Sequence, residues 1–332
     1  MKRILAAAAL FAALSLSAQE KTPPPVTISG MLFGDYYSVI SNHRESREGA
    51  NGFWIRRGYL TADRDLGDAF SARLRLEVNQ PGDFTTNGAL EPYIKDAWLR
   101  WKRSPRLDIS VGLVPTPTFD TVERFWGYRN VEKTPVDLHR LGSSRDLGVS
   151  LSGALDAANR VRYFATFGNG SGTGTETNEG KKATLAVDFA PTPETVLEVY
   201  ADREDRPGAT DRTLLQAFAG LQNKRFRAGL HYGQQSRDGG NDIAFASAFG
   251  AMTVRPNVSV LGRVDRMFDA NPEGEQIPYL PFSATSASTL FIAGVDWKLH
   301  RYVSVIPNVE FVTYDDDLEN DLFARVTLSF VF

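Results

Sequence analysis

The sequence predicts an all-β fold, a closed antiparallel up-and-down barrel of sixteen strands that spans a membrane. Three observations predict it. Apolar and polar residues alternate with a period of two in many segments, most segments have the length of about ten residues that a tilted strand needs to cross a bilayer, and the connections are alternately short and long. Beyond the N-terminal segment, no stretch approaches the length of apolar chain that a membrane-spanning helix needs.

Residues 1–18 have the order of a secretory signal peptide. Met1, Lys2 and Arg3 form a basic start, residues 4–16 form an apolar run, and small residues precede Gln19. We expect cleavage after Ala18, export through the periplasm, and a single transmembrane barrel domain over residues 19–332. A buried N-terminal helix is the alternative interpretation of this segment.

The composition excludes several kinds of site. The chain has no Cys, which rules out disulfides and Cys-based zinc or iron–sulfur centres. Its formal net charge of -3 gives no attraction to nucleic acid. We therefore expect no cofactor, no metal site and no nucleic-acid partner.

The strands are predicted from strict alternation. Leu147, Val149 and Leu151 fall on one face of their segment, whereas Ser150 and Ser152 fall on the other. Such a segment has apolar material on one side and water on the other. The predicted strands are 26–39, 53–65, 69–79, 93–103, 107–115, 146–155, 160–168, 181–190, 194–203, 213–221, 224–234, 243–255, 258–268, 287–298, 301–314 and 321–332.

The connections favour a barrel over a sandwich. Short turns such as Gly67-Asp68 and Pro256-Asn257 alternate with long segments such as 80–92 and 116–145. An up-and-down barrel places the short turns at the periplasmic rim and the long loops outside. Closure also removes both sheet edges, whose unpaired backbone groups would each cost several kcal/mol in hydrocarbon, and sixteen strands leave an aqueous lumen.

The C-terminal strand carries a signal of its own. Leu328, Phe330 and Phe332 share a face, while Arg325 and Thr327 lie on the other. An alternating strand that ends in an aromatic residue resembles the recognition strand of outer-membrane proteins. The resemblance implies that the machinery for barrel insertion binds the strand ending at Phe332.

Motifs in the N-terminal half resemble the phosphate-selective porin O and P family. They are the segment 53–60, the strand with Phe70, Arg73 and Glu77, the segment 96–99, and the segment 145–148 after a long Pro-bearing connection. The resemblance covers roughly residues 26–155. It implies an outer-membrane, trimeric, sixteen-stranded porin whose long third loop folds into the pore. Lys is scarce in this chain, so we do not expect the phosphate selectivity of that family.

Charged residues on the polar faces are expected to line the pore, because a Lys or Arg facing lipid at mid-bilayer costs about 2–4 kcal/mol. Lys and Arg outnumber Asp and Glu in this set, which indicates a weak preference for anions. The principal members are Arg57, Arg73, Arg75, Glu77, Asp96, Arg100, Lys102, Arg162, Arg225, Arg227, Arg263 and Arg325, and the wider set adds Lys182, Asp188, Glu198, Asp202, His231, Asp265 and Glu310.

Arg56 and Arg57 present a conflict, because adjacent residues of a regular strand point to opposite faces. One of them must lie at an interface, at the rim or at a bulge. We expect Arg57 to point inward.

The segment 116–145 is predicted to be the constriction of the pore. It is too long for an ordinary hairpin loop, and its aromatic residues Phe119, Phe125, Trp126 and Tyr128 argue against disorder. An extracellular flap that packs on neighbouring loops is the alternative. Its expected constriction residues are Arg124, Arg129, Lys133, Arg140, Asp120 and Glu123.

Together these features predict an outer-membrane diffusion porin for small hydrophilic or anionic solutes, surrounded by outer-membrane lipid and assembled as a homotrimer. A lipase- or protease-like barrel enzyme is one alternative, and a structural surface protein is another. An enzyme needs a nucleophile and a base. None of His43, His139, His231 and His300 lies in a recognisable nucleophile motif, so we expect no enzymatic activity.

Overall fold

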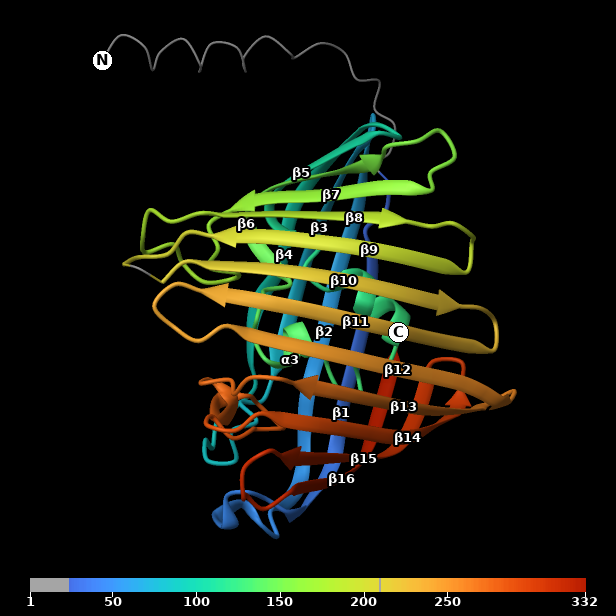
Figure 1. Cartoon of the computed structure of the whole chain (residues 1–332). Coiled ribbons are helices and arrows are strands. Elements are labelled where there is room, and N and C mark those ends of the chain that lie inside the picture. The colour runs from blue at the N-terminus through green and yellow to red at the C-terminus, as the bar shows by residue number, and fades with distance from the viewer. Residues whose placement is uncertain (1–23, 209) are drawn as a thin grey trace.

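The structure, a computed structural model, describes residues 24–208 and 210–332, so the predicted signal peptide lies outside the described residues. Sixteen strands close into one all-antiparallel barrel, which confirms the predicted fold class (Figure 1). The strands are β1 (Thr27–Ser41), β2 (Asn51–Gly67), β3 (Phe70–Asn79), β4 (Glu91–Ser104), β5 (Leu107–Pro115), β6 (Arg145–Ala154), β7 (Val161–Gly168), β8 (Lys182–Phe189), β9 (Thr195–Glu204), β10 (Arg212–Gln222), β11 (Phe226–Arg237), β12 (Ile243–Arg255), β13 (Val258–Met267), β14 (Ser288–His300), β15 (Val303–Tyr314) and β16 (Asp321–Val331).

Each strand pairs with its neighbours in sequence, and β1 pairs with β16 to close the barrel. At this seam the Gly30 N–H donates to the Phe332 carbonyl at 2.8 Å and the Phe332 N–H donates to the Gly30 carbonyl at 2.9 Å. Every backbone edge of the sheet is therefore paired, as a wall in hydrocarbon requires.

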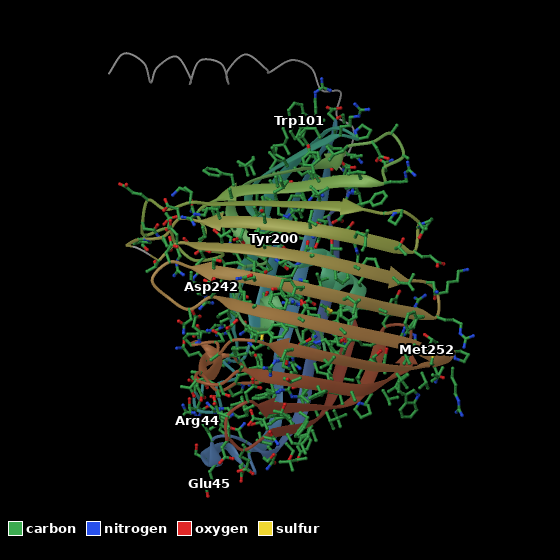
Figure 2. The ribbon with its side chains drawn as sticks, in the orientation of Figure 1. Arg44, Glu45, Trp101, Tyr200, Asp242 and Met252 are labelled. Atoms are coloured by element: carbon green, nitrogen blue, oxygen red, sulfur yellow. The ribbon has the colours of Figure 1, made fainter. Side chains whose placement is uncertain are left out.

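The two faces of the wall differ as the alternation predicts. Leu60, Leu74 and Leu230 point outward and are exposed, whereas Arg325 and Thr327 point inward and are buried. Figure 2 shows Asp242 and Arg44 among the long loops and Met252 beside a short turn at the opposite end of the barrel.

Two of the β-bulges in the sheet each add a residue to the inner face of the barrel. Between β1 and β2 the partners are Phe33↔Arg57 and then Gly34↔Ile55, so Arg56 is an extra residue. Between β3 and β4 the partners are Arg75↔Asp96 and Leu76↔Ile94, so Lys95 is the extra residue. A bulge lets two successive side chains reach the same face. Both bulges are used to place an additional cation on the inner face.

The third external loop, L3 (residues 116–144), folds into the barrel, as predicted. It contains helices α2 (Asp120–Trp126) and α3 (Pro135–Leu138), and α2 packs against β10, β11 and β12 (Figure 1). Helix α2 ends at Gly127, whose φ of 69° is the left-handed conformation that Gly tolerates at a helix C-cap. In the described part of the chain, no helix is long and apolar enough to cross a membrane.

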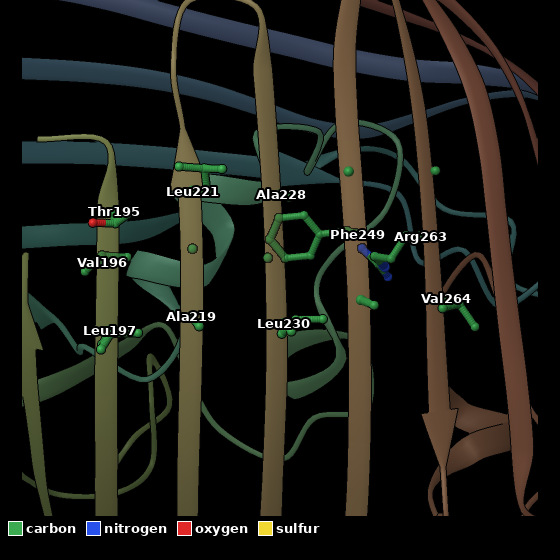
Figure 3. Close-up of a pocket in the computed structure, with 15 residues that line it drawn as sticks. Thr195, Val196, Leu197, Ala219, Leu221, Ala228, Leu230, Phe249, Arg263 and Val264 are labelled. Carbon is green, nitrogen blue, oxygen red and sulfur yellow. The ribbon is translucent and has the colours of Figure 1, made fainter. Parts of the chain in front are cut away.

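The outer wall carries a shallow apolar groove of about 580 Å³ across β9–β13 (Figure 3). Small out-facing residues, among them Ala219, Ala248 and Gly262, form its floor, and Leu197 and Leu230 flank it. Both leucines belong to the exposed outer face. The groove is therefore part of the lipid-facing surface and not of the lumen.

Candidate functional site

Three buried arginines of the wall hold L3 inside the barrel. Arg56 and Arg325 contact the Glu132 carboxylate at 3.0 Å and 3.3 Å. Arg56 also donates to the Val131 carbonyl at 2.6 Å, and Arg263 donates to the carbonyl of Lys133 at 2.6 Å. These arginines come from β2, β16 and β13, so L3 is attached to distant parts of the wall.

Aromatic packing fixes L3 against β10 and β12. The Phe125 and Phe218 rings have centroids 5.6 Å apart, and the Trp126 and Phe249 rings have centroids 5.4 Å apart. The Trp126 indole N–H donates to the Glu132 carbonyl at 2.8 Å. The lumen beside β10–β13 is therefore filled by a packed apolar core.

A second loop also enters the barrel, which the sequence analysis did not anticipate. This loop, L7 (residues 268–287), carries Ile277, Leu280 and Phe282, all buried in the same core as the aromatic residues of L3. The Tyr279 N–H donates to the Gly82 carbonyl at 2.7 Å. A Cβ at Gly82 would lie 2.5 Å from the Tyr279 ring, so glycine is required for this approach.

The open part of the lumen lies on the other side of L3, as a cavity of about 310 Å³. Wall residues from β1, β2, β3, β4 and β6 face α2 and its flanking loop across it. Its lining includes Tyr59, Arg75, Lys95, Arg145, Asp120, Glu123 and Arg129. We take this cavity as the candidate functional site.

On the wall side, two carboxylates are each flanked by two cations. Glu77 lies 3.0 Å from Arg57 and 3.1 Å from Lys95. Asp96 lies 3.3 Å from Arg75 and also contacts Arg145. Each group of three carries one net positive charge. The wall of the cavity is therefore basic, although its arginines are paired.

The loop side of the cavity is acidic by comparison. Glu123 accepts from Arg129 at 2.9 Å and from the Thr134 N–H at 2.9 Å, and Arg129 also contacts Asp137. Burial raises the pKa of Asp120, against the opposing effect of nearby arginines. A basic wall thus faces an acidic loop, and the resulting field runs across the narrow part of the lumen.

Below α2 the lumen continues through two further cavities of about 240 Å³ and 590 Å³. Asp120 lines both the first cavity and the second, while Arg124, Arg162 and Asp188 line both the second and the third. The third cavity reaches the short turns at Asn159 and Asn223. The three cavities share lining residues from the middle of the barrel to its periplasmic rim.

Several of the expected pore-lining residues surround these cavities. Arg57, Arg75, Glu77 and Asp96 form the basic wall, and Arg162 lines the lower cavities. Other members lie on the inner side but pair locally. Arg73 pairs with Asp63, Arg100 stacks on Trp98, Arg227 stacks on Tyr128, and Lys102 and Arg225 are exposed near the short turns.

The expected lining role of Arg263 and Arg325 requires a correction. Both point inward as the alternation requires, but they are 4% and 2% exposed and hold the loops instead of facing water. Alternation specifies the face of the sheet, whereas the contents of the lumen depend on how L3 and L7 fold.

The bulge at Arg56 resolves the conflict between the two adjacent arginines. Arg57 points inward, as expected, and Arg56 points inward as well, 3.2 Å from Asp35. Lys95 was missing from the expected site, and Arg145 was placed in the segment 116–145 but not among its expected constriction residues. Lys95 was not predicted because a regular strand would have directed its side chain outward. The one sign of the bulge in the sequence is an alternating segment that contains one residue too many.

The expected constriction residues of L3 lie in different places, and only some of them line a cavity. Asp120, Glu123 and Arg129 line the candidate cavity, and Arg124 lines the lower cavities. Lys133 lies at the loop tip held by Arg263, and burial lowers its pKa to about 8. Arg140 is exposed and lines none of the three cavities.

A sixteen-stranded closed barrel with an inward third loop defines the class of bacterial outer-membrane porin folds, and solved structures agree. The chain is similar to an anion-selective porin from Comamonas acidovorans (TM-score 0.65, 14% identity, covering 93% of this chain and 99% of that one). It is also similar to Salmonella typhi OmpF in complex with daunomycin (TM-score 0.68, 9% identity, 92% and 97% covered).

A third similar structure is the trimer form of Vibrio cholerae OmpT (TM-score 0.62, 12% identity, 93% and 99% covered). No protein-family model matches the chain, and no curated protein matches it. The comparisons therefore show that the chain shares the fold of these porins. They give no support for the particular phosphate-selective family that the sequence motifs resemble.

Proposed function

We propose that this chain is an outer-membrane diffusion porin for small hydrophilic solutes, with a weak preference for anions. The observation that carries the proposal is the basic wall, in which Glu77 and Asp96 are each flanked by two cations at the narrow part of the lumen. Pore width and lining charge decide which solutes a channel passes. Net positive charge there attracts anions, and the facing acidic loop keeps the preference weak.

The environment of the histidines supports a channel over an enzyme. In the described residues, His43 bonds to carboxylates and a Tyr, His231 bonds to Gln216, and His139 lies against Phe282. His300 contacts a backbone N–H. None is hydrogen-bonded to a Ser or Thr hydroxyl that it could activate as a nucleophile.

Three further expectations belong to this proposal. The trimer form of Vibrio cholerae OmpT supports a homotrimer for the present chain. The pairing of Phe332 at the barrel seam supports recognition of the C-terminal strand by the insertion machinery, because that strand has to be delivered for closure. Cleavage of a signal peptide after Ala18 remains a prediction.

Planar bilayers with a salt gradient test the proposal. We expect steady ohmic conductance steps and a reversal potential that reports a modest chloride preference. Lys95→Gln and Arg145→Gln should each reduce that preference. Lys298→Gln removes the same charge beside a short turn and should leave it unchanged. Absence of conductance from folded protein, or cation preference in the unmodified chain, would overturn the proposal.

A further inference from the structure

The L7 loop occupies the lumen without being part of the wall. It reaches the core through Ile277, Leu280 and Phe282, and it meets L3 where Asn271 donates to the His139 carbonyl at 2.9 Å. Arg325 donates to the Tyr279 carbonyl at 2.7 Å. Displacement of L7 would therefore enlarge the lumen and uncover its own buried residues.

At the external rim, L7 contacts the wall through Glu273, which lies 3.5 Å from Arg212 of β10, and through a cluster around one histidine. Glu275 of L7 lies 3.1 Å from His43 Nε2, and His43 belongs to L1 (residues 42–50). On the opposite side of the ring, His43 Nδ1 lies 2.9 Å from Asp321 at the start of β16. Tyr314 of β15 donates to Asp321 at 2.6 Å. We call His43, Glu275, Tyr314 and Asp321 the rim cluster.

The rim cluster requires the protonated form of His43. Each ring nitrogen faces a carboxylate, and only an imidazolium donates from both nitrogens at once. In a neutral ring that keeps its Nδ1–H toward Asp321, the Nε2 lone pair would face the Glu275 carboxylate. The contact between His43 and Glu275 would then change from attraction to repulsion.

The backbone N–H of His43 also donates to Asp321 at 2.6 Å and holds L1 against β16 whatever the charge of the ring, so the ring charge acts on the contact with L7. Arg44 and Arg47 lie 2.8 Å and 3.0 Å from Glu275, but both belong to L1, so they tie L7 only to L1. Glu48 accepts from the Asn42 N–H within the same loop. The His43 side chain, 4% exposed, is the member that connects Glu275 to a carboxylate of the barrel wall.

We propose that the rim cluster is a pH-sensitive latch that keeps L7 folded inside the lumen, and that loss of the His43 charge releases L7 and widens the pore. The proposal goes beyond a passive porin, because it gives the channel a closed and a wider state.

The pH dependence has a defined sign. Burial lowers the pKa of His43, but hydrogen bonds and charges from Asp321, and then from Glu275, outweigh it, so the pKa is raised above its usual range. A raised pKa in the folded state means that the latch is fully formed below about pH 6.5 and is lost as the pH rises through the raised value. L7 release is therefore expected on the alkaline side.

A thiol probe tests the latch independently of channel activity. The chain has no Cys, so Ser283→Cys places a single, nearly isosteric thiol on L7 where the native side chain is 5% exposed. Its labelling by a small maleimide is compared at one pH, about pH 6, in three backgrounds. They are native His43, His43→Gln, and the matched control His300→Gln, which changes an exposed His beside a short turn.

We expect His43→Gln to label several-fold faster than the native background, and His300→Gln to label like it. In bilayers, the native channel should gain conductance from about pH 6 to about pH 9, while His43→Gln should show the larger conductance throughout. Heat-modifiable gel mobility reports that each variant is folded. Equal labelling of the native and His43→Gln proteins, both folded, would overturn the latch even if the channel conducts as proposed.

Discussion

Glu132 illustrates how a single buried carboxylate organises the lumen. Its carboxylate pairs with Arg56 of β2 and Arg325 of β16. A buried charge is tolerated only when its partner is present. Its backbone carbonyl accepts from Trp126, which links the ion pair to the aromatic core.

Replacement of Glu132 by Gln should leave two guanidinium groups without their shared counter-charge. Removing one partner from a buried ion pair costs about 3–5 kcal/mol. We expect a lower midpoint of urea unfolding and noisier conductance, because the tip of L3 loses its attachment. Glu319→Gln, at an exposed loop position, is the control and should change neither. A Glu132→Gln protein as stable and as quiet as the native one would contradict this role.

At the scale of elements, the two bulges decide which charges reach the lumen. The bulges at Arg56 and Lys95 each insert one residue into a strand, and the inserted residue in each case is a cation. Because residues on both sides of a bulge keep their faces, the inserted residue can be removed without inverting the strand.

Deletion of Lys95 should therefore restore regular pairing between β3 and β4 at that point and preserve the barrel. Glu77 would lose one of its two cations, so chloride preference should fall. Deletion of Ala97, within the regular ladder, should instead turn Asp96 toward lipid and abolish folding. Heat-modifiable gel mobility and circular dichroism report whether each of the two deletion variants folds. If both deletions behaved alike, the bulge would have no such role.

The bulges also show what sequence reasoning could and could not predict. Alternation located all sixteen strands, and for β5 and β12 it gave the observed bounds. It could not place Lys95, since one extra residue reverses the inferred face. Nor could it show that L7 enters the lumen, because that depends on packing between Ile277, Leu280 and residues of L3 far away in sequence.

At the scale of the whole molecule, the barrel is a wall around two unlike halves. One half contains the joint core of L3 and L7, and the other contains the cavities beneath the basic wall. The wall alone would enclose a wide aqueous lumen. The conductance of the protein is therefore set by the loops.

Deletion of residues 120–140 should raise single-channel conductance by removing α2 and the attached tip of L3. It should also strengthen chloride preference, because Arg56, Arg263 and Arg325 would face water instead of the loop. Bilayer conductance and reversal potential report both effects. Unchanged conductance in the folded deletion variant would mean that L3 does not limit flow.

The seam between β1 and β16 has a consequence for how the protein is made. These two strands are separated by almost the whole length of the described chain, yet they are hydrogen-bonded neighbours. Such non-local pairing carries a large entropic cost of loop closure, and this cost slows folding. Until β16 arrives, β1 presents an unpaired edge that can template aggregation. Biogenesis should thus depend on a chaperone that covers the edge of β1 until β16 pairs with it.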